Sequence, residues 1–145
     1  MRKKTKAPIE EKLLTVTVPL GIPTQNGRIY NEEGMQAAVK DYLDAHKGKV
    51  MLGELNPNLE HDSLYIKYLN VSHQITKMEV QDSSFVCHIE LLDTPAGKVV
   101  QDILKETGSL RFEPRTVGEW IDIVHDDGTV TREWKPTALI SFDIV

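Results

Sequence analysis

The 145-residue sequence predicts one compact α+β domain that is rich in β-strand. Three observations support this class: several segments alternate apolar and polar residues, two carry the signals that begin and end helices, and the length suits a single core. Hydrophobic residues make up 40% and charged residues 27%, as in an ordinary globular protein, and no apolar run approaches the roughly 20 residues that span a bilayer.

Alternating side chains identify the strands. Residues 12–18 (KLLTVTV) predict a first strand that ends at Pro19, and residues 49–52 (KVML) predict a short one. Residues 85–92 (FVCHIELL) alternate cleanly and should pair with the second half of residues 64–81, a segment that should bend near Asn70.

The C-terminal third predicts a hairpin followed by a buried strand. Residues 119–134 should fold back at Asp127-Gly128, a favoured hairpin turn. Trp120 and Trp134 then stand at matching places on the two arms, which favours a cross-strand aromatic pair. Residues 137–145 (TALISFDIV) are nearly all apolar, and we expect this last strand to be central.

Two helices are expected, near residues 32–47 and 95–107. Asn31 can cap the first, and Glu32 and Glu33 favour its positive end. The second combines Thr94 as cap, a proline at the first helical position and Gly108 as the stop.

Charge divides the chain into a basic arm, residues 1–11, and a domain, residues 12–145. The net charge of −5 gives no reason to expect specific nucleic-acid binding. The arm lacks the apolar segment of a signal peptide. It is either a flexible tail or a segment that binds an acidic neighbour through its cations, which are Arg2, Lys3, Lys4 and Lys6.

No metal site and no cofactor are expected. The five histidines are scattered, Cys87 is a single cysteine, and no glycine-rich phosphate loop is present. Each histidine is expected to be a surface residue or a strand residue with its hydrogen bonds satisfied.

Two segments concentrate polar residues. The first is GELNPNLEHD, residues 53–62, and the second is GSLRFEPRTVGEW, residues 108–120. A proline within a strand removes a ladder donor, so the second segment predicts a bulged edge strand in which Glu113 pairs with Arg111 or Arg115.

The order of motifs resembles that of the prohead core proteases of tailed bacteriophages, which share a fold with herpesvirus assemblins. The similarity covers roughly residues 25–145, and the motifs that carry it are NGRIY (26–30), GELN (53–56), VSHQITKM (71–78), LDTPAGK (92–98), FEPRTVG (112–118) and SFDIV (141–145). The resemblance implies a compact β-barrel with flanking helices and a serine protease ancestry.

The resemblance also identifies positions where this chain departs from the family. Pro57 stands where the catalytic histidine would follow GELN, and Glu113 stands where the nucleophilic serine would lie, whereas Glu54 and Arg115 are retained. Proline cannot accept a proton, and a carboxylate cannot be activated as serine is. These departures predict a pseudoprotease that is not an enzyme.

Two other sets of residues offer a route to restored activity. His61 and Ser109 each lie four residues from the degenerate positions, and Glu54 with Glu113 could form a carboxylate dyad. The plainer interpretation makes Glu54 a structural acid.

The resulting expectation is a phage virion structural protein, such as a minor capsid, cement or decoration subunit, located in the virion and assembled in the host cytoplasm. Its partners would be the major capsid protein, other virion proteins or further copies of itself, and its basic arm would dock on a capsid subunit. Two alternatives are a regulator of the prohead protease or scaffold, and an active maturation protease with relocated catalytic residues.

Overall fold

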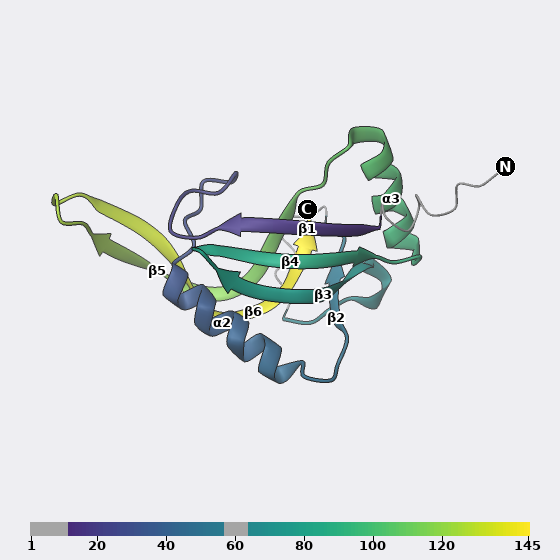
Figure 1. Cartoon of the computed structure of the whole chain (residues 1–145), viewed down its shortest axis with the longest axis horizontal. Helices are drawn as coiled ribbons and strands as arrows, with labels where there is room; N and C mark the ends of the chain where they lie inside the picture. Colours follow the sequence, from purple (N-terminus) through teal and green to yellow (C-terminus); the bar gives the residue numbers. More distant parts are fainter. Residues whose placement is uncertain (1–11, 57–63) are drawn as a thin grey trace.

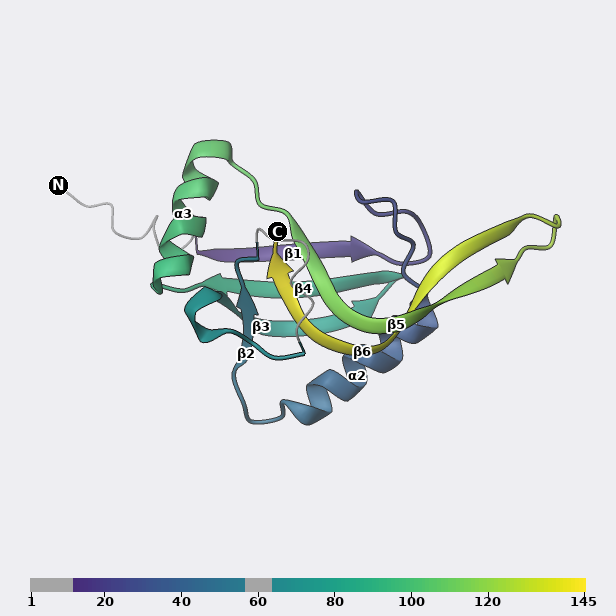
Figure 2. The same cartoon turned by 180° about the vertical axis from the view of Figure 1, so that it is seen from behind.

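The structure is a computed structural model that describes residues 12–56 and 64–145. Its strands form a four-stranded antiparallel sheet, in the order β1-β4-β3-β2, and a two-stranded ribbon of β5 and β6. The ribbon curves across one face of the sheet (Figures 1 and 2). The strands are β1 Leu13–Pro19, β2 Met51–Glu54, β3 Val71–Gln81, β4 Ser84–Leu91, β5 Phe112–Val124 and β6 Val130–Ile144.

The two predicted helices are present, and their caps are the expected ones. Helix α2 spans Glu32–Ala45, two residues shorter than predicted, and the Asn31 side chain accepts a hydrogen bond from the Gly34 N–H. Helix α3 spans Pro95–Thr107, as predicted, and ends at Gly108 in the left-handed conformation. The bend expected near Asn70 is a short 3-10 helix, η1 Tyr68–Asn70. No helix in the described parts of the chain is long and apolar enough to cross a membrane.

The expected β-barrel is not closed. The sheet and the ribbon meet on one side only, where Leu55 forms a parallel bridge with Ile144 and the Asn56 N–H donates to the Ile144 carbonyl at 2.7 Å. The described strands therefore form an open series, β1-β4-β3-β2-β6-β5, whose first and last members are not paired with each other. The mixed α+β class is correct, but the barrel is a partial one.

The last strand also differs from its prediction. It belongs to the two-stranded ribbon and does not lie in the middle of the larger sheet. Its C-terminal end is nevertheless buried, because it lies between β5 and the β2 segment. The core beneath it joins both sheets and α2, and its largest apolar members are Tyr30, Met35, Phe85, Ile89, Leu91 and Phe142.

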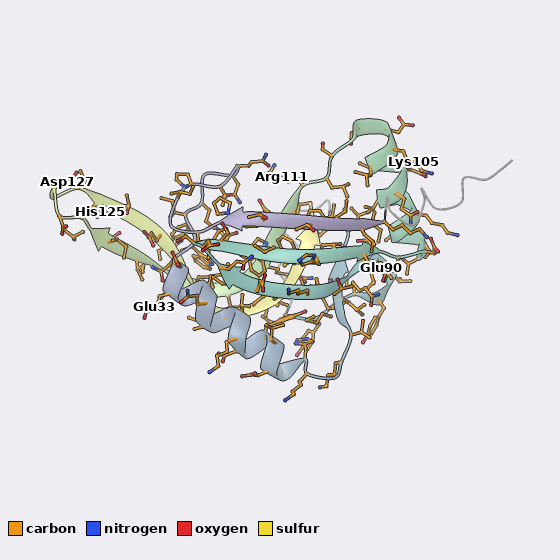
Figure 3. The ribbon with its side chains drawn as sticks, viewed as in Figure 1. Glu33, Glu90, Lys105, Arg111, His125 and Asp127 are labelled. Atoms are coloured by element: carbon orange, nitrogen blue, oxygen red, sulfur yellow. The ribbon has the colours of Figure 1, made fainter. Side chains whose placement is uncertain are left out.

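The outer half of the ribbon leaves the body (Figure 1). The predicted hairpin turn is confirmed, with the Gly128 N–H donating to the His125 carbonyl at 2.9 Å and a positive φ of 87° at Gly128. His125 and Asp127 lie at its far end (Figure 3). Trp120 and Trp134 face each other across the strands with ring centroids 5.1 Å apart, which confirms the aromatic pair.

Candidate functional site

The polar motifs of the sequence meet where the sheet joins the ribbon. Glu54 of the GELN motif pairs with Arg115 of FEPRTVG, and Asp143 of SFDIV pairs with the same arginine. We call Glu54, Arg115, Ser141 and Asp143 the Arg115 cluster. Glu54 belongs to the four-stranded sheet and Arg115 belongs to the ribbon, so the cluster joins the ribbon to the sheet.

The geometry of the cluster is that of a hydrogen-bonded buried ion pair. Arg115 Nη2 lies 2.7 Å from Glu54 Oε2, and Arg115 Nε lies 2.9 Å from Asp143 Oδ2. The Ser141 hydroxyl donates to Asp143 Oδ1 at 2.8 Å, and it accepts a hydrogen bond from Arg115 Nε at 3.0 Å. Backbone donors complete the shell, since the Glu54 N–H reaches Asp143 at 3.1 Å and the Lys67 N–H reaches Glu54 at 3.1 Å.

Burial determines what this cluster can do. The side chains of Arg115, Glu54 and Asp143 are only 8%, 0% and 3% exposed. Buried charges are retained when they are paired and hydrogen-bonded, because an unpaired one would lose its hydration without compensation. The cluster therefore has a structural role in holding the ribbon against the sheet, and Glu54 has the surroundings expected of a structural acid.

A second buried polar pair lies beside it. The Ser72 hydroxyl is 2.7 Å from His73 Nδ1, and His73 Nε2 is 2.7 Å from the Phe142 carbonyl oxygen. A carbonyl can only accept, so Nε2 carries the proton and Nδ1 accepts from the hydroxyl. Burial lowers the pKa of His73, more than its hydrogen bond to Phe142 and the nearby Asp143 raise it. A Cβ at Gly53 would collide with this ring, so the site requires glycine there.

Hydroxyl and imidazole thus have the contact that a serine nucleophile and its base make. Both residues are 0% exposed, however, so a peptide bond cannot reach them in this conformation. His73 satisfies the expectation of a strand histidine with its hydrogen bonds made.

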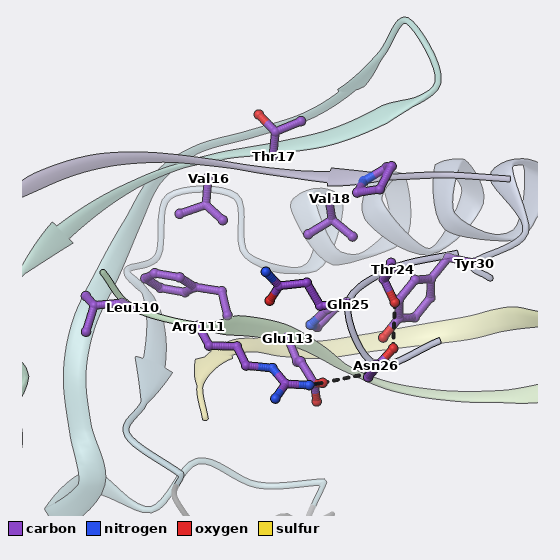
Figure 4. Close-up of a pocket in the computed structure, with 13 residues that line it drawn as sticks. Val16, Thr17, Val18, Thr24, Gln25, Asn26, Tyr30, Leu110, Arg111 and Glu113 are labelled. Atoms are coloured by element: carbon purple, nitrogen blue, oxygen red, sulfur yellow. Dashed lines mark hydrogen bonds and ion pairs between the residues drawn. The ribbon is translucent and has the colours of Figure 1, made fainter. Parts of the chain in front are cut away.

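Glu113 points to a different place, an open groove between β1 and the start of β5 (Figure 4). Its carboxylate accepts a 2.7 Å hydrogen bond from the Asn26 side chain and lies 3.4 Å from Arg111 Nη2. The predicted pairing with Arg111 is thus present, and Arg115 is instead committed to the Arg115 cluster. The expected bulge is confirmed as a register shift between Arg115 and Thr116.

The groove has two connected parts along β1. The first is a cavity of about 280 Å³ whose walls include Val16, Val18, Tyr30, Leu110, Phe112 and Glu113. The second, of about 310 Å³, continues along the same strand to Leu104 of α3 and the exposed Ser109. Figure 4 shows Val16 and Val18 directed into the first part and Thr17 directed away from it.

The remaining predicted site residues are distributed as follows. Pro57 and His61 lie outside the described residues, and so do the cations Arg2, Lys3, Lys4 and Lys6 of the basic arm. Glu54 and Glu113 bind different partners, Arg115 for one and Asn26 with Arg111 for the other, which does not support a carboxylate dyad. Within residues 12–56 and 64–145, no three His, Cys, Asp or Glu side chains form a metal-binding group.

Sequence reasoning missed Ser72, Ser141 and Asp143 as partners in these clusters. VSHQ and SFDIV carry part of the family resemblance, but neither motif identifies Arg115, 28 residues away, as the partner of Asp143. The available signal was a serine and an aspartate within an otherwise apolar strand, since a buried acid requires a cation.

Comparison with known proteins supports the fold. No protein-family model and no curated protein matches the chain. Among solved structures, the capsid assembly protease gp21 of bacteriophage T4 superposes with a TM-score of 0.65 at 18% sequence identity. The match covers 90% of this chain and 80% of that chain, so the resemblance to a prohead protease holds at the level of the fold.

This comparison overturns the prediction that the chain is not an enzyme. The fold that it shares is that of an assembly protease, and the described residues do not show that catalytic groups have been lost. The prediction rested on two single positions, Pro57 and Glu113, and Pro57 is outside the described residues. An aligned position does not reveal which groups meet in space, as Ser72 and His73 illustrate.

Proposed function

We propose that this chain acts in the assembly of a tailed-phage capsid, where it binds other head proteins and remains in the particle as a minor structural subunit. The observation that supports this most is the fold shared with the T4 capsid assembly protease over 90% of the chain. The proposed location is the phage particle, after assembly in the host cytoplasm.

The basic arm is the proposed contact with a major capsid subunit. Ordering eleven residues costs on the order of 1–2 kcal/mol each in backbone entropy, and four cations on an acidic neighbour could offset part of it. Many copies on one shell would strengthen weak contacts through avidity. Deletion of residues 1–6 should leave the domain folded and lower its occupancy on particles, more so at low salt, because salt screens the contribution of these cations.

Mass spectrometry of purified proheads and mature virions tests the proposal. A subunit present at constant stoichiometry in both supports a structural role. Presence in proheads alone would instead favour a regulator of the protease or scaffold, and absence from both would contradict a role as a head protein.

A peptidase role in the same assembly is the second candidate. The shared fold favours it, and so does an open groove whose walls carry Ser109 and Glu113. Incubation with the scaffold protein of the same phage, followed by peptide mass mapping, tests it directly. Cleavage that a Ser109→Ala change abolishes would establish the activity, and intact scaffold would contradict it.

A further inference from the structure

We infer that two copies of this chain associate about a two-fold axis through an apolar surface that α3 and the segment before β3 form together. We call this surface the end patch, and its members are Leu64, Tyr65, Tyr68, Leu69, Val99 and Ile103. α3 lies at the end of the molecule opposite the hairpin tip (Figure 1). The association does not depend on the proposed function, because it follows from the exposure, rigidity and charge of this surface.

The segment before β3 exposes its largest side chains to solvent. Tyr65 and Tyr68 are both 79% exposed, Leu69 is 91% exposed and Leu64 is 59% exposed. Single exposed apolar residues are common on protein surfaces, whereas contiguous groups of them mark interaction sites. This segment therefore has the composition of a contact surface.

α3 supplies the second part of the end patch. The helix buries Gly97 and Val100 and leaves Val99 and Ile103 49% and 38% exposed. η1 lies directly beside α3, so the two parts adjoin. The six side chains together expose on the order of 700 Å² of surface, close to the roughly 800 Å² that each partner buries in a standard protein interface.

The backbone under this surface is held in place by the Arg115 cluster. The Tyr65 carbonyl accepts a hydrogen bond from Arg115 Nη1 at 3.3 Å, and the Lys67 N–H donates to Glu54 Oε2 at 3.1 Å. Buried partners thus fix the segment while its apolar side chains remain in solvent. A surface that is already ordered loses little conformational entropy when it binds.

Charge divides the end patch into two halves. On α3, Asp102 and Glu106 share the exposed face with Val99 and Ile103, because residues three and four apart lie on one side of a helix. On the segment before β3, the exposed charged residue is Lys67. None of these three charged residues forms a salt bridge with another described residue. One half is therefore acidic and the other basic, which makes the surface complementary to a second copy of itself.

A two-fold axis can join these halves in two ways. Either each half meets the same half of the second copy, or each half meets the opposite half. The first arrangement places Asp102 and Glu106 beside the same two acids, whereas the second places Lys67 of each copy against the acids of the other. Like charges in contact are unfavourable, so the charges select the second, crosswise arrangement, which forms the same contact twice.

Analytical ultracentrifugation of the purified full-length chain across the micromolar range tests the association. The natural chain should sediment as a monomer–dimer equilibrium. Leu69→Asp places a charge in the end patch and should raise the dimer dissociation constant at least tenfold. Val124→Asp is the matched control, because it places the same charge on an exposed apolar residue of the hairpin, and it should leave the constant unchanged.

Charge exchange tests the crosswise arrangement. Lys67→Glu alone, and Asp102→Lys with Glu106→Lys in one chain, should each weaken the dimer at least tenfold, because like charges then face each other. A one-to-one mixture of the two variant chains should form a heterodimer about as tight as the natural dimer, since both contacts then join opposite charges. Recovery on mixing would also show that both variants are folded.

Three results would overturn the inference. The first is a natural chain that stays monomeric throughout, including one whose end patch binds the major capsid protein instead. The second is a Leu69→Asp chain that dimerises as the natural chain does, and the third is a pair of charge variants that do not recover on mixing. A chain that dimerises as described yet is absent from phage heads would refute the proposed function alone.

Discussion

The two ends of the β5–β6 ribbon share one hydrogen-bonded ladder but have opposite surroundings. At the inner end, Ser141, Phe142 and Asp143 are buried, Asp143 contacts Glu54 of β2 and Phe142 contacts His73 of β3. At the outer end, Val124 and Val130 pair with each other but are 71% and 59% exposed. An isolated two-stranded hairpin is marginally stable in water, so the ladder alone does not explain the fold.

The ribbon is therefore stabilised by its side-chain contacts, with the rest of the protein at one end and between its own strands at the other. The inner end is stabilised by the buried Arg115 of β5. This arginine pairs with Glu54 of the four-stranded sheet and with Asp143 of β6. The outer end depends on cross-strand contacts, chiefly Trp120 with Trp134 and the two arginines, Arg28 and Arg132, that lie over their rings. Substitutions at the two ends should therefore differ greatly in their effect on stability.

Replacement of Arg115 by methionine should have the largest effect. Methionine keeps much of the volume but leaves Glu54 and Asp143 buried without their cation, which typically costs about 3–5 kcal/mol in the free energy of unfolding. Urea denaturation followed by circular dichroism measures the change.

Arg132→Met is the matched control at the outer end. Arg132 is exposed and lies 5.2 Å from the Trp120 ring centroid, a contact worth about 0.5–1 kcal/mol. Equal destabilisation by the two substitutions would contradict the view that the ends differ.

Low pH should lower the stability of the inner end of the ribbon, because His73 is buried there. Its pKa is lowered in the folded state from the ordinary 6.5, so the unfolded chain binds a proton more readily. The contribution is complete above pH 6.5 and is lost as the pH falls from 6.5 toward the folded-state pKa, by up to about 1.4 kcal/mol per pH unit. Denaturation curves between pH 7.5 and pH 5.5 measure this decline.

Two variants assign the decline to the buried ring. His73→Gln should flatten the profile, even though it lowers stability at every pH. His125→Gln, an exposed substitution at the hairpin turn, should retain the slope of the natural chain. A slope that His73→Gln leaves unchanged would show that other groups cause the acid sensitivity.

Local chemistry made the helices and the hairpin predictable from the sequence. The Asn31 and Thr94 caps, the left-handed Gly108 and the turn at Gly128 each act within a few residues, so a short stretch of sequence contains all the partners. The Trp120–Trp134 pair followed from the turn, because the turn fixes the register of the hairpin.

The site could not be predicted in the same way, because its contacts join residues that are far apart in the sequence. Arg115 binds Glu54, which is 61 residues away, and the expectation that it might pair with Glu113 came from sequence proximity alone. The closed barrel was inferred from a family resemblance, whereas closure depends on whether β1 and β5 approach within hydrogen-bonding distance. That distance is set by the packing of the whole core, including Phe112 and Leu110 between the two strands.

The most local predicted effect is that of Trp120→Ala at the outer end. Removal of this ring deletes the edge-to-face pair with Trp134 and the face on which Arg132 lies, which together should cost about 1–2 kcal/mol locally. The Trp134 indole N–H keeps its 2.9 Å hydrogen bond to Thr116 Oγ1, so the loss of stability should stay near the tip of the ribbon.

Hydrogen exchange should accelerate for the amides of residues 119–134 and remain slow for those of residues 139–144. Val124→Ala, which removes a side chain 71% exposed on the same strand, should change neither set. Faster exchange at residues 139–144 in the Trp120 variant would mean that the ribbon opens as one unit, and the inner end would then depend on the outer one.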